Sequence, residues 1–236
     1  MFTDRGDAGR QLGQRLRHLR ASETRPEMGP VVVLGLPRGG VLVAAEVAGA
    51  LGAPLDVIVV RKLGVPSQPE LAMGAIGEGG VRILLPETVQ HAGITPAALA
   101  AVERRERAEL ARRAERFRGD RPRVPLAGRT AVVVDDGIAT GSTARAACQV
   151  ARAQGATRIV VAVPVAPLGW VRGMRDAADE LIALLTPVAL GAIGAWYTDF
   201  SQTTDEEVVA CLHQPTQLTN RAGLSGNAID AAECGK

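Results

Sequence analysis

Short apolar runs rich in valine recur along the chain, and each is bounded by glycine, proline or charged residues. Runs of this length without alternating polar positions predict buried strands of a parallel sheet, because helices cover both faces of such a sheet. The expected strands are residues 31–36, 55–60, 130–134, 158–165 and 180–185.

Alanine-rich segments with helical periodicity lie between most of these strands, at residues 41–51, 143–154 and 168–177. Gly52 and Gly155 stand where helix C-caps are expected. Strand and helix in alternation imply right-handed parallel crossovers. The fold class is therefore predicted to be α/β, with a central, mostly parallel sheet flanked by helices.

Two segments depart from this alternation. Residues 95–118 are a long charged helical stretch, predicted to be a solvated surface helix with pairs such as Glu103 and Arg107; a dimer contact is the alternative. Residues 64–80 are rich in glycine and proline and predict a long loop that could act as a lid. We expect one domain over residues 1–213, with its core at about 30–190, and a poorly ordered tail over 214–236.

Composition adds a few exclusions. The 236 residues are 47% hydrophobic and carry a formal net charge of +2, which is ordinary for a globular protein and too near zero to indicate an extended nucleic-acid or membrane surface. The first residues lack the apolar region of a secretory signal, so a cytoplasmic location is expected. The most apolar stretch, 181–196, is shorter than the ~20 residues of a membrane span.

The segment AVVVDDGIATGST, residues 131–143, carries the clearest chemistry. A strand there ends in Asp135 and Asp136, which can accept hydrogen bonds from vicinal ribose hydroxyls. A glycine, threonine and serine loop then enters a helix, whose first N–H groups and dipole favour a phosphate. No lysine follows Gly141 as a P-loop requires, and no dinucleotide fingerprint is present. An acidic turn with a helix cap is the structural alternative.

This segment resembles the PRPP motif of type I phosphoribosyltransferases. The resemblance implies a parallel core with a small hood, and transfer of phosphoribose from PRPP, with Mg²⁺, to a nitrogen base, releasing pyrophosphate. Asp135 and Asp136 would hold the ribose hydroxyls and, through PRPP, the metal. The phosphate-binding residues implied by the motif are Gly137, Ile138, Ala139, Thr140, Gly141, Ser142 and Thr143.

A second resemblance lies in the Pro-Arg-Gly-Gly turn after the first strand, which is similar to the family's pyrophosphate loop. Pro37, Arg38, Gly39 and Gly40 would face the leaving group, although a tight turn alone would also favour these glycines. Arg61 and Lys62 follow the second strand, where the family places basic residues near pyrophosphate; a role as surface charges is the alternative. The resemblance implies that Asp135, Asp136, Arg38 and Lys62 carry catalysis.

The acceptor base is less well indicated. Ala139 stands where members acting on 6-oxopurines usually have an aspartate, which puts such an acceptor in doubt. Trp196 lies in an aromatic cluster with Tyr197 and Phe200 and is the predicted base contact, with core packing or a subunit contact as alternatives. Over about residues 4–212 the chain most resembles a bacterial group of uncharacterised phosphoribosyltransferases, so nucleotide salvage, a homodimer and no membrane partner are expected.

Two other functions remain open. Relatives of the family act as PRPP sensors that regulate transcription or RNA, and the arginines of 95–118 could offer a basic face, but interleaved glutamates argue against nucleic-acid binding. An enzyme using a phosphorylated sugar differently, such as a phosphatase, is the second alternative, with Asp135 as nucleophile or base.

Overall fold

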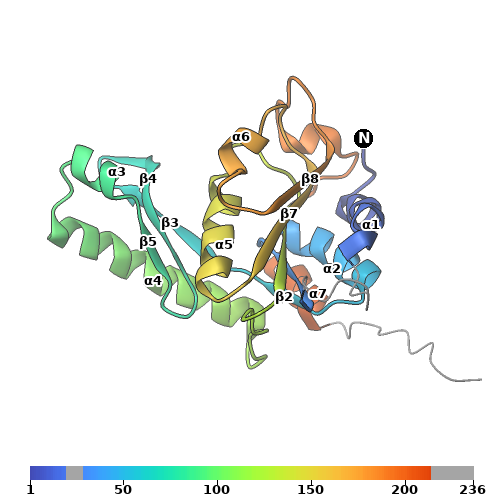
Figure 1. Ribbon diagram of the computed structural model, residues 1–236, viewed down its shortest axis with the longest axis horizontal. Coiled ribbons are helices and arrows are strands. Elements are labelled where there is room, and N and C mark those ends of the chain that lie inside the picture. The colour runs from blue at the N-terminus through green and yellow to red at the C-terminus, as the bar shows by residue number, and fades with distance from the viewer. Residues whose placement is uncertain (20–28, 214–236) are drawn as a thin grey trace, which may run out of the picture.

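The computed structural model describes residues 1–19 and 29–213, so the predicted tail of 214–236 lies outside the described residues. Its centre is a parallel sheet in the order β2-β1-β6-β7-β8 (Figure 1). The strands are β1 (Val31–Gly35), β2 (Leu55–Val57), β6 (Thr130–Val134), β7 (Arg158–Val165) and β8 (Glu180–Leu185). This confirms the predicted α/β class and all five strands, except that β2 ends at Val57 rather than at residue 60.

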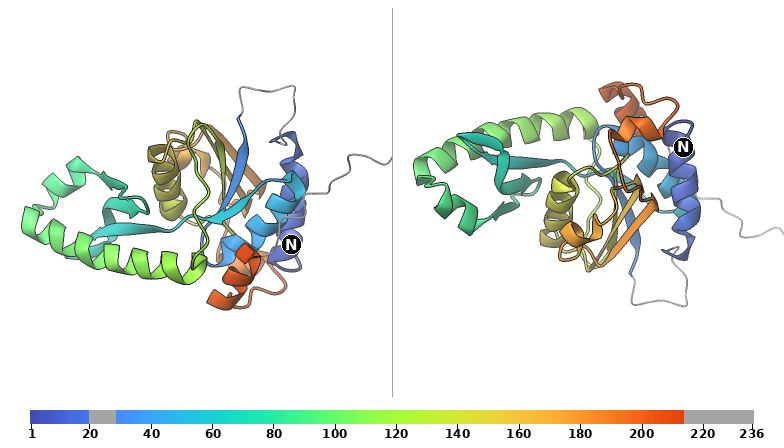
Figure 2. Two further views of the ribbon diagram at one scale, coloured as in Figure 1. Left: turned by 90° about the horizontal axis from the view of Figure 1, so that it is seen from below. Right: turned by 90° about the horizontal axis from the view of Figure 1, so that it is seen from above.

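Helices cover both faces of the sheet, which explains why its strands have no polar side. One face is covered by α1 (Arg5–Arg15), α2 (Gly39–Leu51) and α7 (Asp205–His213), and the other by α5 (Ser142–Ala153) and α6 (Val171–Met174) (Figure 2). Along β1, Val31 and Val33 join the first core, whereas Val32 and Leu34 join the second. The helix predicted over 168–177 is shorter than expected, and α1 and α7 were not predicted.

The predicted loop at 64–80 is wrong. Residues there form an antiparallel sheet of β3 (Val60–Val65), β4 (Gln68–Gly77) and β5 (Arg82–Leu84), followed by α3 (Pro86–His91). A side chain at Gly64 would meet the Pro69 backbone oxygen at 2.4 Å, so this glycine permits close strand packing rather than flexibility. This smaller sheet projects from the central sheet as a lobe (Figures 1 and 2), and we call it the hairpin lobe.

The helix α4 (Pro96–Arg118) runs along the hairpin lobe and back to the core (Figure 2). Its predicted bounds are confirmed, and Thr95 caps it by accepting from Ala98 N–H at 3.2 Å. The expectation of a solvated helix holds only for its outer face. The inner face of the helix is apolar and buried, with the side chains of Leu99, Val102, Leu110 and Phe117.

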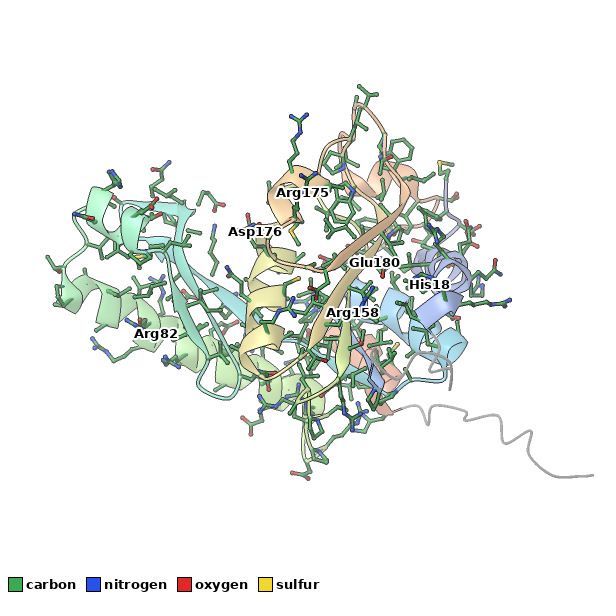
Figure 3. The ribbon with its side chains drawn as sticks, viewed as in Figure 1. His18, Arg82, Arg158, Arg175, Asp176 and Glu180 are labelled. Atoms are coloured by element: carbon green, nitrogen blue, oxygen red, sulfur yellow. The ribbon has the colours of Figure 1, made fainter. Side chains whose placement is uncertain are left out.

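Polar contacts also tie the N-terminal segment to the last strand of the central sheet. His18 Nε2 lies 3.1 Å from Glu180 Oε1, and Arg158 donates to the other carboxylate oxygen of Glu180 at 2.8 Å (Figure 3). A further link is the bridge between Phe2 and Tyr197. The chain's first residues therefore lie beside the segment that follows β8, close to the carboxyl ends of the strands.

Candidate active site

The two motif segments meet at one edge of the central sheet. Strands β1 and β6 are parallel neighbours, and their last residues, Gly35 and Val134, stand opposite each other in register. Leu36 N–H donates to the Val134 carbonyl at 2.9 Å, so the two segments that follow β1 and β6 leave the sheet side by side. Ligands of open α/β sheets bind at the carboxyl ends of the strands, where these two loops lie.

Glycines allow the loops to touch. A Cβ atom at Gly39 would lie 2.0 Å from Asp136 Oδ2, and one at Gly40 would lie 2.8 Å from Asp135 Cα. No side chain fits at either position without displacing the acids. The Pro-Arg-Gly-Gly turn is therefore more than a tight turn, because its glycines bring its backbone against the acid pair. The peptide bond between Pro37 and Arg38 is cis.

The two acids have different surroundings. Asp135 Oδ1 accepts from the backbone N–H of Asp136 at 2.9 Å. Burial, together with the neighbouring Asp136 carboxylate, raises the pKa of Asp135 well above its ordinary value. Asp136 instead has a cation beside it, because its Oδ2 accepts from Arg5 Nε at 2.8 Å. The pair thus combines one acid whose charge is costly with one whose charge is balanced.

Sequence reasoning missed Arg5. It stands in the first turn of α1, 131 residues before its partner Asp136, and no motif marks it. Its Nη1 donates to the Ser201 carbonyl at 2.8 Å, and its guanidinium carbon lies 3.9 Å from the centroid of the Phe200 ring.

Tyr197 supports the acid pair from behind. Its hydroxyl donates to the Asp136 carbonyl at 2.6 Å, and its ring packs between Phe2 and Phe200. Burial, then the charge of Asp136, raises the pKa of Tyr197 above its usual value, so the phenol remains a donor at neutral pH. The aromatic cluster therefore braces the loop that follows β6.

The predicted phosphate loop connects β6 to α5. Gly141 adopts a left-handed conformation with φ of +78° directly before the helix, where a residue with a side chain would be strained. Thr140 and Ser142 lie at the helix start, and their hydroxyl oxygens are 3.2 Å apart in an exposed position. Ile138, in contrast, is buried and anchors the loop. Exposed hydroxyls at the start of a helix are suited to an anion.

A cavity of about 370 Å³ opens beside the acid pair. It is lined by residues from the chain's start, the Pro-Arg-Gly-Gly turn and the segment before α7, namely Arg5, Arg38, Gly39, Phe200, Gln202 and Thr203. Two guanidinium groups on its wall make it a candidate site for an anionic group.

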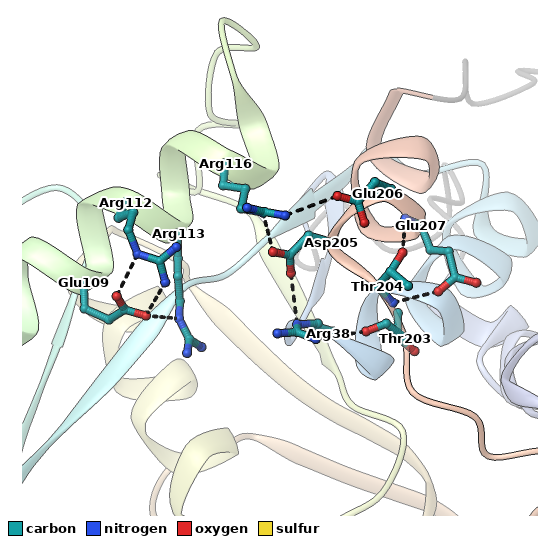
Figure 4. A network of polar contacts seen from close by, with 10 residues as sticks. All are labelled: Arg38, Glu109, Arg112, Arg113, Arg116, Thr203, Thr204, Asp205, Glu206 and Glu207. Atoms are coloured by element: carbon teal, nitrogen blue, oxygen red, sulfur yellow. Dashed lines mark hydrogen bonds and ion pairs between the residues drawn. The ribbon is translucent and has the colours of Figure 1, made fainter.

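Arg38 is held by the segment that precedes and begins α7 (Figure 4). Its Nε lies 2.9 Å from Asp205 Oδ1, and its Nη1 donates to the Thr203 carbonyl at 3.2 Å. Asp205 also forms an ion pair with Arg116 of α4. Two ion pairs that share Asp205 thus link the predicted pyrophosphate loop to α4.

Three predicted residues have partners outside these loops. Arg61 is paired with Glu106 of α4 at 2.6 Å, and Lys62 with Glu70 of β4 at 3.2 Å. Trp196 donates from Nε1 to the Leu190 carbonyl at 2.9 Å and is not among the cavity's lining residues. Phe200, rather than Trp196, is the aromatic side chain on the cavity wall.

Two kinds of feature are absent from the described part of the chain. Within 1–19 and 29–213, no group of three or more His, Cys, Asp or Glu side chains could hold a metal ion. Among the same residues, no helix has both the length and the apolar character needed to cross a membrane.

Comparison with known proteins identifies the family. The family model described as "Phosphoribosyl transferase domain" matches residues 7–169. Two Mycobacterium tuberculosis proteins, from strains CDC 1551 and H37Rv, are each named "Putative phosphoribosyl transferase" and are 57% identical over 232 residues. These matches cover 98% of this chain but 50% of the relatives, so the chain spans about half the length of the curated proteins it matches.

A solved structure is similar over nearly the whole chain. The crystal structure of TT1426 from Thermus thermophilus shares 45% identity, covers 90% of this chain and 97% of that chain, and superposes with a TM-score of 0.79. The order of the central strands, the two loops at its edge and the match of the family model over most of the chain lead to one conclusion: the chain belongs to the phosphoribosyl transferase family.

Proposed function

We propose that this chain binds PRPP and transfers its phosphoribosyl group to a nitrogen base, with release of pyrophosphate. One observation carries the proposal. The acid pair lies between the predicted phosphate loop on one side and the Pro-Arg-Gly-Gly turn on the other, in contact with the latter through Gly39 and Gly40. PRPP has the same order of groups, with a diol flanked by a monophosphate and a diphosphate.

Each loop suits one part of that substrate. Asp136 offers an acceptor for a ribose hydroxyl, and Asp135 adds a second acceptor when it is deprotonated. The backbone N–H groups and hydroxyls at the start of α5, from Thr140 to Thr143, can donate to the 5-phosphate. Arg38 and the backbone of the glycines can donate to the diphosphate.

The reaction needs positioning and charge stabilisation rather than a covalent nucleophile. The acceptor nitrogen forms a bond to the anomeric carbon as the bond from that carbon to the diphosphate oxygen breaks. The electron pair leaves with pyrophosphate, whose negative charge rises in the transition state. Arg38 therefore contributes most when it is held near that oxygen before the reaction begins, as its bonds to Asp205 and Thr203 suggest.

Mg²⁺ is the expected companion of PRPP. The described residues provide two adjacent acids but no three-ligand set, and Asp136 is already paired with Arg5. This donor set fits a metal that arrives with PRPP, and Asp135 and Asp136 are the residues that would help to hold it. When bound, the ion neutralises charge on the leaving group.

The acceptor remains a proposal at the level of a nitrogen base. Ala139 offers no carboxylate for a 6-oxopurine, so adenine or a pyrimidine is preferred. Phe200 lines the cavity, but its ring already packs against Arg5 and Tyr197, so the base contact at Trp196 stays a prediction. The family's homodimer and a role in nucleotide salvage stay predictions.

The ion pairs of α4 argue against nucleic-acid binding by the sensor alternative. Several arginines of α4 have acidic partners within the chain, as Arg112 and Arg113 have in Glu109. Arg116 is paired with Asp205 and Glu206. Charges already paired in this way release fewer counterions on binding a nucleic acid, so the basic face gains little affinity from them.

A release assay tests the proposal. The full chain, with PRPP and Mg²⁺, is incubated separately with adenine, guanine, hypoxanthine, xanthine, uracil and orotate, and pyrophosphate is measured. Release with one base supports transfer and names the acceptor. PRPP binding without release from any base would contradict transfer and favour a sensor.

A further inference from the structure

Arg5 reaches the site from the N-terminal helix and is fixed there on three sides. Its Nε contacts Asp136, its Nη1 contacts the Ser201 carbonyl, and its guanidinium lies over the Phe200 ring. The side chain is only 10% exposed. A guanidinium held in this way has lost its rotational freedom before a ligand arrives, so a further hydrogen bond costs little additional entropy.

One nitrogen of Arg5 remains for a ligand. No described residue accepts a hydrogen bond from Nη2, and Arg5 lines the cavity of about 370 Å³ together with Arg38 and Gly39. At about 30 Å³ per water molecule, this volume holds on the order of ten water-sized groups, comparable with the atoms of a diphosphate.

Thr203 provides an independent observation on the same wall. It is 5% exposed, and its hydroxyl is buried without a hydrogen-bond partner among the described residues. An unpaired buried hydroxyl is unfavourable, and Thr203 is one of the residues that line the cavity, so an acceptor bound there would relieve this cost. The Thr203 carbonyl already accepts from Arg38, so the residue is adjacent to the pyrophosphate loop.

We propose that Arg5 binds the leaving diphosphate while it remains paired with Asp136, and that Thr203 completes this pocket. One guanidinium would thus join the acid that holds the ribose to the group that departs from it. As the bond from the anomeric carbon to oxygen breaks, charge on the diphosphate rises, and the contact with Arg5 strengthens. This inference rests on the proposed function, but it concerns residues near the two ends of the described chain that lie outside both loops.

The test measures binding of inorganic pyrophosphate, with Mg²⁺, to the full chain by isothermal titration. Arg5→Gln is expected to weaken the affinity by about tenfold or more, because it removes a charge-assisted hydrogen bond. Arg5→Lys, which keeps the charge but not the fork of donors, should fall between. Arg10→Gln is the matched control: Arg10 lies on the same helix, is 57% exposed and contacts Glu46, so its affinity should equal that of the wild type.

If Arg5→Gln fails to fold, Thr203→Val provides a second test of the pocket. Valine has the same shape without the unpaired hydroxyl, so the variant should be at least as stable as the wild type yet bind pyrophosphate several-fold more weakly. In a transfer assay, with kcat referred to the folded fraction of each protein, Arg5→Lys should lower kcat more than it raises KM for PRPP, as expected for a contact that strengthens in the transition state.

The outcomes separate the two proposals. Wild-type affinity for pyrophosphate in Arg5→Gln, or in both Arg5→Lys and Thr203→Val, would overturn the role of this pocket even if the chain transfers phosphoribose. Arg5-dependent pyrophosphate binding, without release from PRPP with any base, would support the pocket and contradict the transferase.

Discussion

A negative charge on Asp135 favours binding of a ribose hydroxyl but destabilises the folded protein. Its pKa is raised by burial and by Asp136, so the folded protein binds a proton more tightly than the unfolded chain, where the ordinary value of 3.8 applies. The contribution of this group to the free energy of unfolding is therefore fully present below about pH 3.8, and it is lost as the pH rises through the raised pKa.

Asp135→Asn should accordingly stabilise the protein at neutral pH, by about 1 kcal/mol, because asparagine carries no charge into this site and its oxygen can still accept from Asp136 N–H. Urea unfolding of both proteins at pH 7 and pH 3 measures the effect. The difference should shrink at pH 3. A variant less stable than the wild type at pH 7 would show that the carboxylate is not a cost to the fold.

Arg5 shows what sequence reasoning could not reach at the residue scale. The acid pair and the Pro-Arg-Gly-Gly turn were predictable because each is a local pattern with a physical reason at every position. Arg5 and its partner Asp136 are far apart in the sequence, and they come together only when α1 packs onto the sheet. Trp196 was preferred over Phe200 because sequence alone does not say which ring of a cluster faces a cavity.

At the scale of elements, a buried ion pair fastens α4 to the core. Arg118, the last residue of that helix, contacts Asp56 at 3.1 Å, and their side chains are 7% and 1% exposed. Arg118 also contacts Glu78 of the hairpin lobe and donates to the Val57 carbonyl at 2.9 Å. One side chain therefore joins three segments.

Arg118→Met is expected to destabilise the protein by about 3 kcal/mol, because it leaves Asp56 buried without its cation. Denaturant unfolding measures the loss. Arg112→Met on the same helix is the control, since its side chain is 61% exposed and its ion pair is open to solvent, and its stability should be nearly unchanged. Equal stability of the two variants would contradict this account of α4.

Lys62 lies in the hairpin lobe, and its role in catalysis is a prediction that a substitution can test. Lys62 Nζ donates to the Glu70 carbonyl at 3.1 Å and contacts the Glu70 carboxylate, which is 96% exposed. Such exposed contacts are weak, so the lysine can turn toward bound PRPP if the lobe closes. Lys62→Gln should then slow pyrophosphate release by about tenfold or more with little change in stability. Glu70→Gln is the matched control, because it breaks the pair and keeps the lysine. Identical rates in both variants would leave Lys62 as a surface partner only.

The five strands of the central sheet and the helices α2 and α5 were predictable, because burial on both faces leaves a continuous apolar run and glycine marks the ends of these two helices. The hairpin lobe was not, since glycine and proline in residues 64–80 have the same composition as a loop. Gly64 permits contact between strands, and only the tertiary structure reveals that reason.

At the scale of the whole molecule, both ends of the described chain contribute to the site. The family match ends at residue 169, yet Tyr197, Phe200 and Asp205 contact the acid pair, Arg5 and Arg38 from beyond that point. The segment that follows the family match therefore contributes directly to the site, and the domain boundary near residue 213 stays a prediction.

A truncated chain of residues 1–213 should keep cooperative unfolding and bind pyrophosphate as the full chain does. A chain of residues 1–169 lacks β8, the Ser201 and Phe200 contacts of Arg5, and both partners of Arg38, so it should lose cooperative unfolding. Thermal melting monitored by circular dichroism distinguishes these outcomes. A well-folded shorter chain would show that the later segment is an addition to a complete domain.

Binding of PRPP tests the central claim most directly. Isothermal titration with PRPP and Mg²⁺ is performed on the wild type and on Asp135→Asn/Asp136→Asn, with circular dichroism to confirm that both fold. Binding to the wild type and a loss of about tenfold or more in the double variant would support the acid pair as the ribose site. Equal affinity in the two proteins, or no binding to the wild type, would contradict it.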